Sequence, residues 1–265
     1  MDASFLLKLG LSFVIGSLWV TLTTQSAERF GSKVGGLIGG LPSTVVVALL
    51  FIGLTQSPEV AAQTTTVMPL AQGLNGLFVL TFMVFIQRGL WAGLSSAMFV
   101  WLVQSALLYL VKINVFWVSV VGWLALLAFC SLALVKWMNV RAFERMQVSY
   151  PAGQIIWRAL FGGAVIALAV LMGKLGGALL GGIFGSFPAM FLSTLVITHK
   201  TGGASFSRAV GKSMLISGLI NVPIYEILVR YLYPPLGLAT GTVVALVCAL
   251  ITGYLTYQFI AKIIQ

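Results

Sequence analysis

Long apolar runs separated by short polar breaks make up most of this chain. A membrane-spanning helix needs about 20 mostly apolar residues, and placing the breaks at charged residues, prolines and glycines predicts nine such helices. They are expected at residues 4–24, 34–55, 60–87, 90–111, 114–137, 153–173, 176–198, 207–232 and 236–260. The third begins with the polar stretch Gln63-Thr64-Thr65-Thr66, so its first turns are expected outside the hydrocarbon.

The composition agrees with this pattern. The chain has 265 residues, of which 60% are hydrophobic and 8% are charged, and its mean hydropathy is +1.07. Soluble domains carry roughly 25% charged residues, so this chain has too few charges to cover a water-exposed surface. The prediction is an all-α membrane protein with about nine transmembrane helices. The first run contains only Lys8 before its apolar core and no A-x-A site follows, so we expect it to be retained and not cleaved as a signal peptide.

The net charge of +10 comes from basic residues that stand singly or in pairs between the apolar runs. Such spacing does not suit a surface that follows a phosphate backbone, so nucleic acid is not an expected partner. With nine spans the basic residues divide eleven to four between the two sides. By the positive-inside rule the larger group is cytoplasmic, with the N-terminus outside and the C-terminus in the cytoplasm. The larger group is Arg29, Lys33, Arg88, Lys136, Arg141, Arg145, Arg158, Lys200, Arg208, Lys212 and Lys262, and the smaller is Lys8, Lys112, Lys174 and Arg230.

An internal repeat relates the two halves of the chain. Residues 35–42 read GGLIGGLP and residues 181–188 read GGIFGSFP, an offset of 146, with three of the glycines and the proline identical. At the same offset Asn75 pairs with Asn221. We predict a four-helix repeat over 1–112, a linking helix and cytoplasmic loop over 113–150, and a second four-helix repeat over 151–265. One unpaired helix between two copies makes them inverted in the membrane, which is typical of secondary transporters with a site near the midplane.

The repeated motif carries the candidate chemistry. Proline and glycine inside a membrane helix free backbone groups that protein or cavity water must satisfy. Half-helices that start at Pro42 and Pro188 would point their positive ends into the membrane and could hold a carboxylate or phosphate. The candidate substrate-binding residues are Gly39, Gly40, Pro42, Ser43, Thr44, Gly185, Ser186, Pro188, Asn75 and Asn221.

A packing role for the same residues stays open. Glycines four residues apart let helices approach closely, and such rows are formed by Gly31, Gly35 and Gly39, by Gly36 and Gly40, and by Gly173, Gly177, Gly181 and Gly185. For Asn75 and Asn221, hydrogen bonding between helices and contact with a substrate are equally good interpretations.

Two acids are candidates for coupling transport to protons. Glu226 lies inside a predicted span, where an ionisable group is costly and often functional, but Arg230 one turn later offers an i,i+4 ion pair instead. Glu59 follows Ser57-Pro58, which is typical of a helix start, so an early-helix acid is the competing interpretation. His199, beside Lys200, is interpreted as an interfacial residue.

No catalytic or cofactor motif is present. The sequence has no GxxxxGK[ST] and no GxSxG, and Cys130 and Cys248 stand alone in apolar runs. We therefore expect no enzymatic activity, no cofactor and no metal.

The second half resembles the GlpM-like family of small bacterial inner-membrane proteins. The resemblance is carried by 182–188 (GIFGSFP), Arg208-Ala209, Ser213-Met214 and Pro223-Ile224-Tyr225. The first half matches less well, because it has Gly39-Gly40-Leu41-Pro42 and lacks the Arg-Ala pair. The resemblance implies a fused tandem duplicate of a four-helix unit, with a suggested link to envelope polysaccharide production.

Together these features predict a secondary transporter or flippase that moves a small anionic or lipid-linked substrate by alternating access between inverted repeats. The alternative is a non-transporting membrane scaffold for envelope polysaccharide or lipid assembly, and a channel is disfavoured because no ring of like residues marks a filter. Membrane lipids are the expected partners, and a homo-oligomer is left open.

Overall fold

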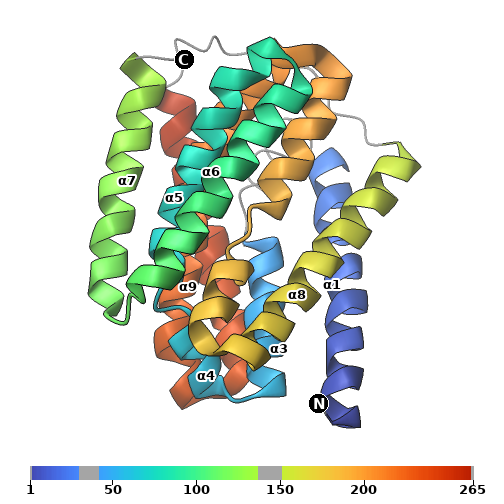
Figure 1. Cartoon of the computed structure of the whole chain (residues 1–265), viewed down its shortest axis with the longest axis vertical. Helices are drawn as coiled ribbons and strands as arrows, with labels where there is room; N and C mark the ends of the chain where they lie inside the picture. Colours follow the sequence, from blue (N-terminus) through green and yellow to red (C-terminus); the bar gives the residue numbers. More distant parts are fainter. Residues whose placement is uncertain (1, 30–41, 137–150, 264–265) are drawn as a thin grey trace.

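The computed structural model describes residues 2–29, 42–136 and 151–263, and within these ranges all regular secondary structure is helical. Figure 1 shows the helices as a bundle with the start of α1 at one end of the long axis and the last turns of α9 near the other. The elements are α1 (Ala3–Arg29), α3 (Ser43–Thr55), α4 (Pro58–Thr64), α5 (Met68–Phe85), η1 (Ile86–Arg88), α6 (Leu90–Val111), α7 (Phe116–Lys136), α8 (Ala152–Gly185) and α9 (Ala189–Ile263).

Single glycines divide the two longest elements. A straight helix of 75 residues, the length of α9, would measure about 110 Å, far more than the roughly 30 Å of a bilayer's hydrocarbon core. Instead α8 turns at Gly177 and α9 turns at Gly203 and Gly237, each with φ between 72° and 73°. Only glycine adopts this backbone region readily. These turns lie close to the breaks that the hydrophobic pattern predicts in this half of the chain.

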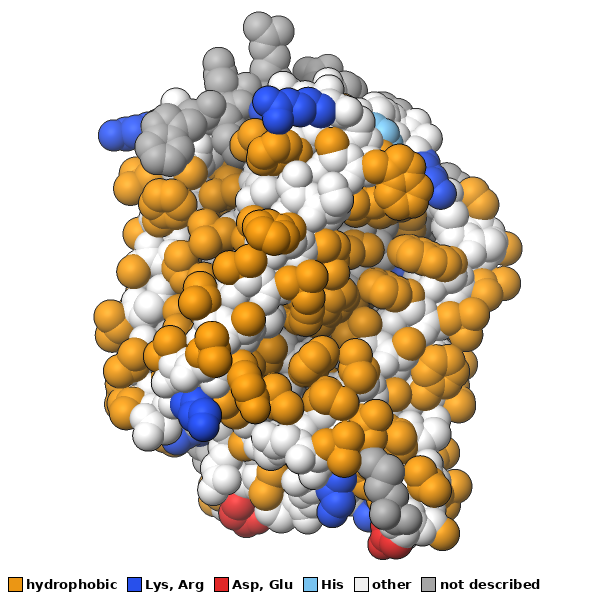
Figure 2. All heavy atoms as spheres, viewed as in Figure 1, with side chains coloured by type: hydrophobic (Ala, Val, Ile, Leu, Met, Phe, Trp, Pro, Cys, Tyr) orange, Lys and Arg blue, Asp and Glu red, His pale blue; other side chains and the backbone are white. Residues whose placement is uncertain are grey.

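The surface has the distribution of a membrane protein. Five stretches of the described chain are long and apolar enough to cross a bilayer, and the fifth, Ala152–Leu255, contains several of the turned helices. Leu110 on α6 and Val121 on α7 are 71% and 64% exposed, which suits lipid and not water. In Figure 2 the charged side chains lie near the two ends of the molecule and leave a broad apolar band between them.

The third predicted helix is in fact two. A turn over residues 65–67 separates α4 from α5, so the expectation of one helix over 60–87 is corrected. Pro69 explains the break, since it has no N–H to bond the Thr65 carbonyl four residues back. The Thr65 side chain bonds to the preceding turn of the chain: its Oγ1 donates to Ala62 O at 2.7 Å.

The glycines allow close packing, but not as the single row expected in the second half. Because Gly177 reverses the chain, Gly173 and Gly181 face each other across the turn, and a Cβ on Gly181 would lie 3.0 Å from Gly173 Cα. A Cβ on Gly163 would lie 2.6 Å from Phe13 O, so α8 packs directly against the backbone of α1. The glycines therefore have the packing role predicted for small residues, and Gly163 brings α8 against α1, which is far from it in the sequence.

Helix α7 also stabilises α9 directly. Pro223 lies inside α9 and cannot bond the carbonyl of Leu219, four residues back. The indole N–H of Trp123 on α7 donates to that carbonyl at 2.6 Å. The linking helix thus satisfies a backbone group that the proline leaves free.

Candidate functional site

The helical structure is interrupted at the second copy of the repeated motif, as the sequence predicts. Helix α8 ends at Gly185, residues 186–188 are non-helical, and α9 begins at Ala189. The amide of Leu192 bonds back to Pro188 O at 2.9 Å. The amides of Met190 and Phe191 precede it and stand at the free end of the helix.

The first copy has the same geometry where it is described. Helix α3 begins at Ser43, directly after Pro42, and the amide of Val46 bonds back to Pro42 O at 2.8 Å. This bond is the counterpart of the Leu192–Pro188 bond at the 146-residue offset. Gly39 and Gly40 lie outside the described residues.

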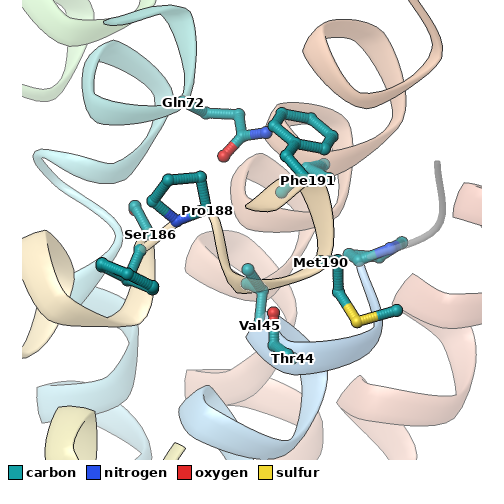
Figure 3. A pocket seen from close by; sticks show the side chains of 10 residues that line it. Thr44, Val45, Gln72, Ser186, Pro188, Met190 and Phe191 are labelled. Carbon is teal, nitrogen blue, oxygen red and sulfur yellow. The ribbon is translucent and has the colours of Figure 1, made fainter. Parts of the chain in front are cut away.

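The two helix starts meet at one pocket. In Figure 1, α3 runs downward from the middle of the molecule and the first part of α9 runs upward from it. The pocket between them has about 360 Å³ of empty volume, and in Figure 3 the carboxamide of Gln72 and the hydroxyl of Thr44 point toward it. Its lining residues are Pro42, Thr44, Val45, Gln72, Ser186, Phe187, Pro188, Met190, Phe191 and Val222.

The electrostatics of this arrangement suit an anion. The N-terminus of each helix carries a partial positive charge of roughly half an elementary charge, and two such ends face the same space. Ser186 lines this space and Ser43 begins α3 beside it; each side chain is 3% exposed, and its Oγ has no hydrogen-bond partner among the described residues. Buried polar atoms usually have a partner, so these hydroxyls are available to a ligand or to water.

Asn75 holds the break in place. Its Nδ2 donates to Ser186 O at 2.7 Å and to Gln72 Oε1 at 3.0 Å. It therefore satisfies a carbonyl that no longer belongs to a helix, which supports the interhelical interpretation of this residue. Asn221 donates to Ser217 Oγ, one turn back on its own helix, at 3.0 Å, and does not line the pocket.

Arg158 is a site residue that the sequence reading missed. It was assigned to the cytoplasmic boundary by the charge count, yet it is only 4% exposed, and its Nη2 lies 3.6 Å from Met190 Sδ. Met190 lines the pocket. Arg158 does not itself line the pocket, but this contact brings its guanidinium beside the start of α9. Nothing in the hydrophobic pattern around 153–173 distinguishes it from an interfacial arginine.

The comparisons with known proteins find one family model that matches two stretches of the chain. The family described as "Protein of unknown function (DUF3147)" matches residues 9–114 and again residues 155–262. The chain belongs to the DUF3147 family. The two matches begin 146 residues apart, the offset of the internal repeat, as expected of a tandem duplicate. The GlpM-like resemblance stays a prediction. No curated protein and no solved structure matches the chain.

In this DUF3147 protein the predicted ion pair within α9 is absent. Glu226 is fully buried and neither of its carboxyl oxygens has a hydrogen-bond partner. Arg230 faces other groups instead. Its Nη1 donates to Ala62 O at 3.3 Å and to Thr66 Oγ1 at 3.0 Å, and its guanidinium lies 4.4 Å from the centre of the Phe116 ring. The i,i+4 spacing allowed a pair, but the polar break between α4 and α5 offers the guanidinium better acceptors.

Glu59 has the early-helix position predicted for it. It is exposed in the first turn of α4, where Ser57 Oγ caps the helix by accepting from Val60 N at 3.2 Å. The hydrogen bond from Ser57, followed by one from the backbone, lowers the pKa of the Glu59 carboxyl below its usual value. Glu59 is not among the residues that line the pocket. His199 is partly exposed near the turn at Gly203, in agreement with an interfacial interpretation.

Proposed function

We propose that this protein is a secondary transporter of the bacterial inner membrane that moves a small anionic or lipid-linked substrate. Two inverted four-helix repeats would rock about the pocket between Pro42 and Pro188 and open it to each side in turn. The meeting of two helix N-termini at one pocket lined mostly by buried side chains carries the proposal, because broken helices that converge in this way are how inverted-repeat transporters bind anions.

The path of the chain supports the inverted arrangement. In Figure 1, helices paired by the 146-residue offset run in opposite directions: α1 against the first part of α8, α3 against the first part of α9, and α6 against the last part of α9. With α7 unpaired between them, the chain would cross the bilayer nine times. Lys112 directly follows α6 and Arg88 ends η1, while Lys174 and Lys200 each lie three residues before a glycine turn, so all four stand at helix ends, where juxtamembrane basic residues are expected.

Cysteine labelling tests the inversion with one matched pair of positions. Glu59 and Ser205 are repeat-related and both exposed. In a background without Cys130 and Cys248, a membrane-impermeant maleimide is expected to label Glu59→Cys in intact cells, and Ser205→Cys only after the membrane is opened. Labelling of both from the same side would contradict the inverted repeat.

Transport itself can be tested in proteoliposomes with labelled inorganic phosphate and labelled succinate, which stand for the phosphate and carboxylate classes. The double variant Pro42→Ala, Pro188→Ala is expected to lose about 90% of the uptake of whichever anion the wild type moves. Alanine supplies the N–H that proline lacks, so the helices can continue across the breaks and the free helix ends that would hold the anion are lost; about 1.4 kcal/mol of lost binding is tenfold. Pro234→Ala, Pro235→Ala is the matched control, since these prolines are exposed at the turn near Gly237. Wild-type uptake in the first double variant would rule out the site.

The rival function is a membrane scaffold for envelope assembly. It predicts that the protein co-purifies with a stable enzyme partner and that reconstituted protein moves neither anion. The buried Ser43 and Ser186 hydroxyls and the buried Arg158 favour transport, because a scaffold has no need of polar groups in its own interior.

A further inference from the structure

A fully buried carboxyl, that of Glu226, lies next to the proposed transport site and is not used by it. Among the described residues that line the pocket none is acidic. Glu226 is 0% exposed, and both oxygens lack a hydrogen-bond partner. A carboxyl in this state inside a membrane helix is expensive and is found mainly where ions or protons move.

On α9, Glu226 lies between Val222 at the pocket and Arg230. Val222, one turn before Glu226, lines the pocket, and Arg230, one turn after it, is bound to α4 and stacked on Phe116. Residues four apart share a helix face and stand about 6 Å apart along its axis. Glu226 therefore lies one turn from the pocket wall, on the side toward Arg230.

The neighbouring elements offer no other acid beside it. Helices α3 and α5, which pack against α9, carry no titratable side chain, and on α4 only Glu59 titrates, at the exposed end. The remaining titratable groups on described elements packed against α9 are Tyr109 on α6, Cys130 and Lys136 on α7, and Arg158 and Lys174 on α8. On α9 itself, Tyr225, Arg230, Tyr231 and Tyr233 lie within two turns.

We propose that Glu226 is the carboxyl that couples anion movement to protons, an inference that rests on the proposed transport function. In each cycle a proton from water on one side forms an O–H bond with a Glu226 oxygen, and it leaves to water on the other side after the repeats have rocked. No oxidant or co-substrate is required.

The first test measures proton binding without any substrate. Infrared difference spectra of the protein in lipid nanodiscs, recorded as the pH is stepped, report the C=O stretch of a protonated carboxyl. The wild type is expected to show a band from a water-excluded carboxyl, and Glu226→Gln is expected to lack it. Glu59→Gln is the matched control and keeps the band. A band unchanged by Glu226→Gln would overturn the assignment.

The second test measures coupling in proteoliposomes with labelled phosphate or succinate. One coupled proton across a gradient of about one pH unit supports about tenfold accumulation. Glu226→Gln is expected to abolish this accumulation while anion exchange at equal pH continues, because the residue does not line the pocket. Glu226→Asp, which keeps the carboxyl, is expected to recover part of it.

The outcomes separate the two proposals. If the wild type moves neither anion, both the transport function and the coupling role are wrong. If the wild type moves an anion but a pH gradient does not drive it, or a Na⁺ gradient does, only the coupling role is wrong. Gradient-driven accumulation at the wild-type level in Glu226→Gln would also overturn the coupling role alone.

Discussion

Helix α5 and residues 214–231 of α9 are paired by the 146-residue offset but carry different polar groups. In α5 the buried polar side chains are the neutral amides Gln72 and Asn75, which line or support the pocket. In α9 the ionisable Glu226 and Arg230 stand where α5 has Leu80 and Val84. The two copies have thus diverged into one that shapes the site with hydrogen bonds and one that carries charge beside it.

The largest expected effect on stability comes from replacing Arg230, a charged residue of the second copy, with an apolar residue. Arg230→Met removes two hydrogen bonds from a charged donor and a contact with Phe116, and is expected to lower the free energy of unfolding by about 3 kcal/mol. The repeat-related Val84→Met is the control, because Val84 is 54% exposed and its change is expected to cost less than about 0.5 kcal/mol. Reversible unfolding in mixed detergent micelles measures both. Equal effects would mean that Arg230 has no special structural role.

The next largest effect is expected at the repeat-related asparagines, Asn75 and Asn221, whose replacement should lower the free energy of unfolding by different amounts. Asn75→Leu leaves Ser186 O buried without a donor and is expected to cost about 2 kcal/mol. Asn221→Leu loses a bond to Ser217 on its own helix and is expected to cost about 1 kcal/mol. The same unfolding measurement compares them. A larger loss at Asn221 would show that the copies are more alike than their hydrogen bonds suggest.

The smallest effect on stability is expected from removing the Trp123 donor to the Leu219 carbonyl, which Pro223 leaves without a helical N–H. Trp123→Phe is expected to cost about 1 kcal/mol in the wild type, because Leu219 O then has no donor. In a Pro223→Leu background, which copies the leucine found at the paired position 77, the backbone supplies the donor and Trp123→Phe is expected to cost close to nothing. The coupling energy from this double-mutant cycle is the measurement. Strictly additive losses would contradict the assigned role of Trp123.

The helix positions and breaks that depend on neighbouring residues in the sequence were predictable. Apolar length and breaks predicted most of the described helices, although the single helix expected over 60–87 is two. The repeated Gly and Pro predicted where α8 and α9 separate, because glycine and proline act on the backbone at their own positions. The helix start at Ser57-Pro58 was predicted for the same reason.

Features that depend on side chains meeting across the bundle were not predictable in this way. The spacing of Glu226 and Arg230 indicated an ion pair, and only the packing of α4 beside α9 gives Arg230 other partners. The burial of Arg158 and the donation by Trp123 likewise depend on neighbours more than 30 residues away. Gly177 was expected to extend a packing row, but its positive φ turns the chain instead.

The single-glycine turns at Gly177, Gly203 and Gly237 have a consequence for how the second half is assembled. Helices joined by one residue have no loop that could cross the bilayer late or be cut by a protease, so they have to enter the membrane as hairpins. By contrast, four residues, 112–115, separate α6 from α7. An epitope tag inserted there should leave the fold intact, whereas the same tag at Gly203 would separate two helices that only one residue joins.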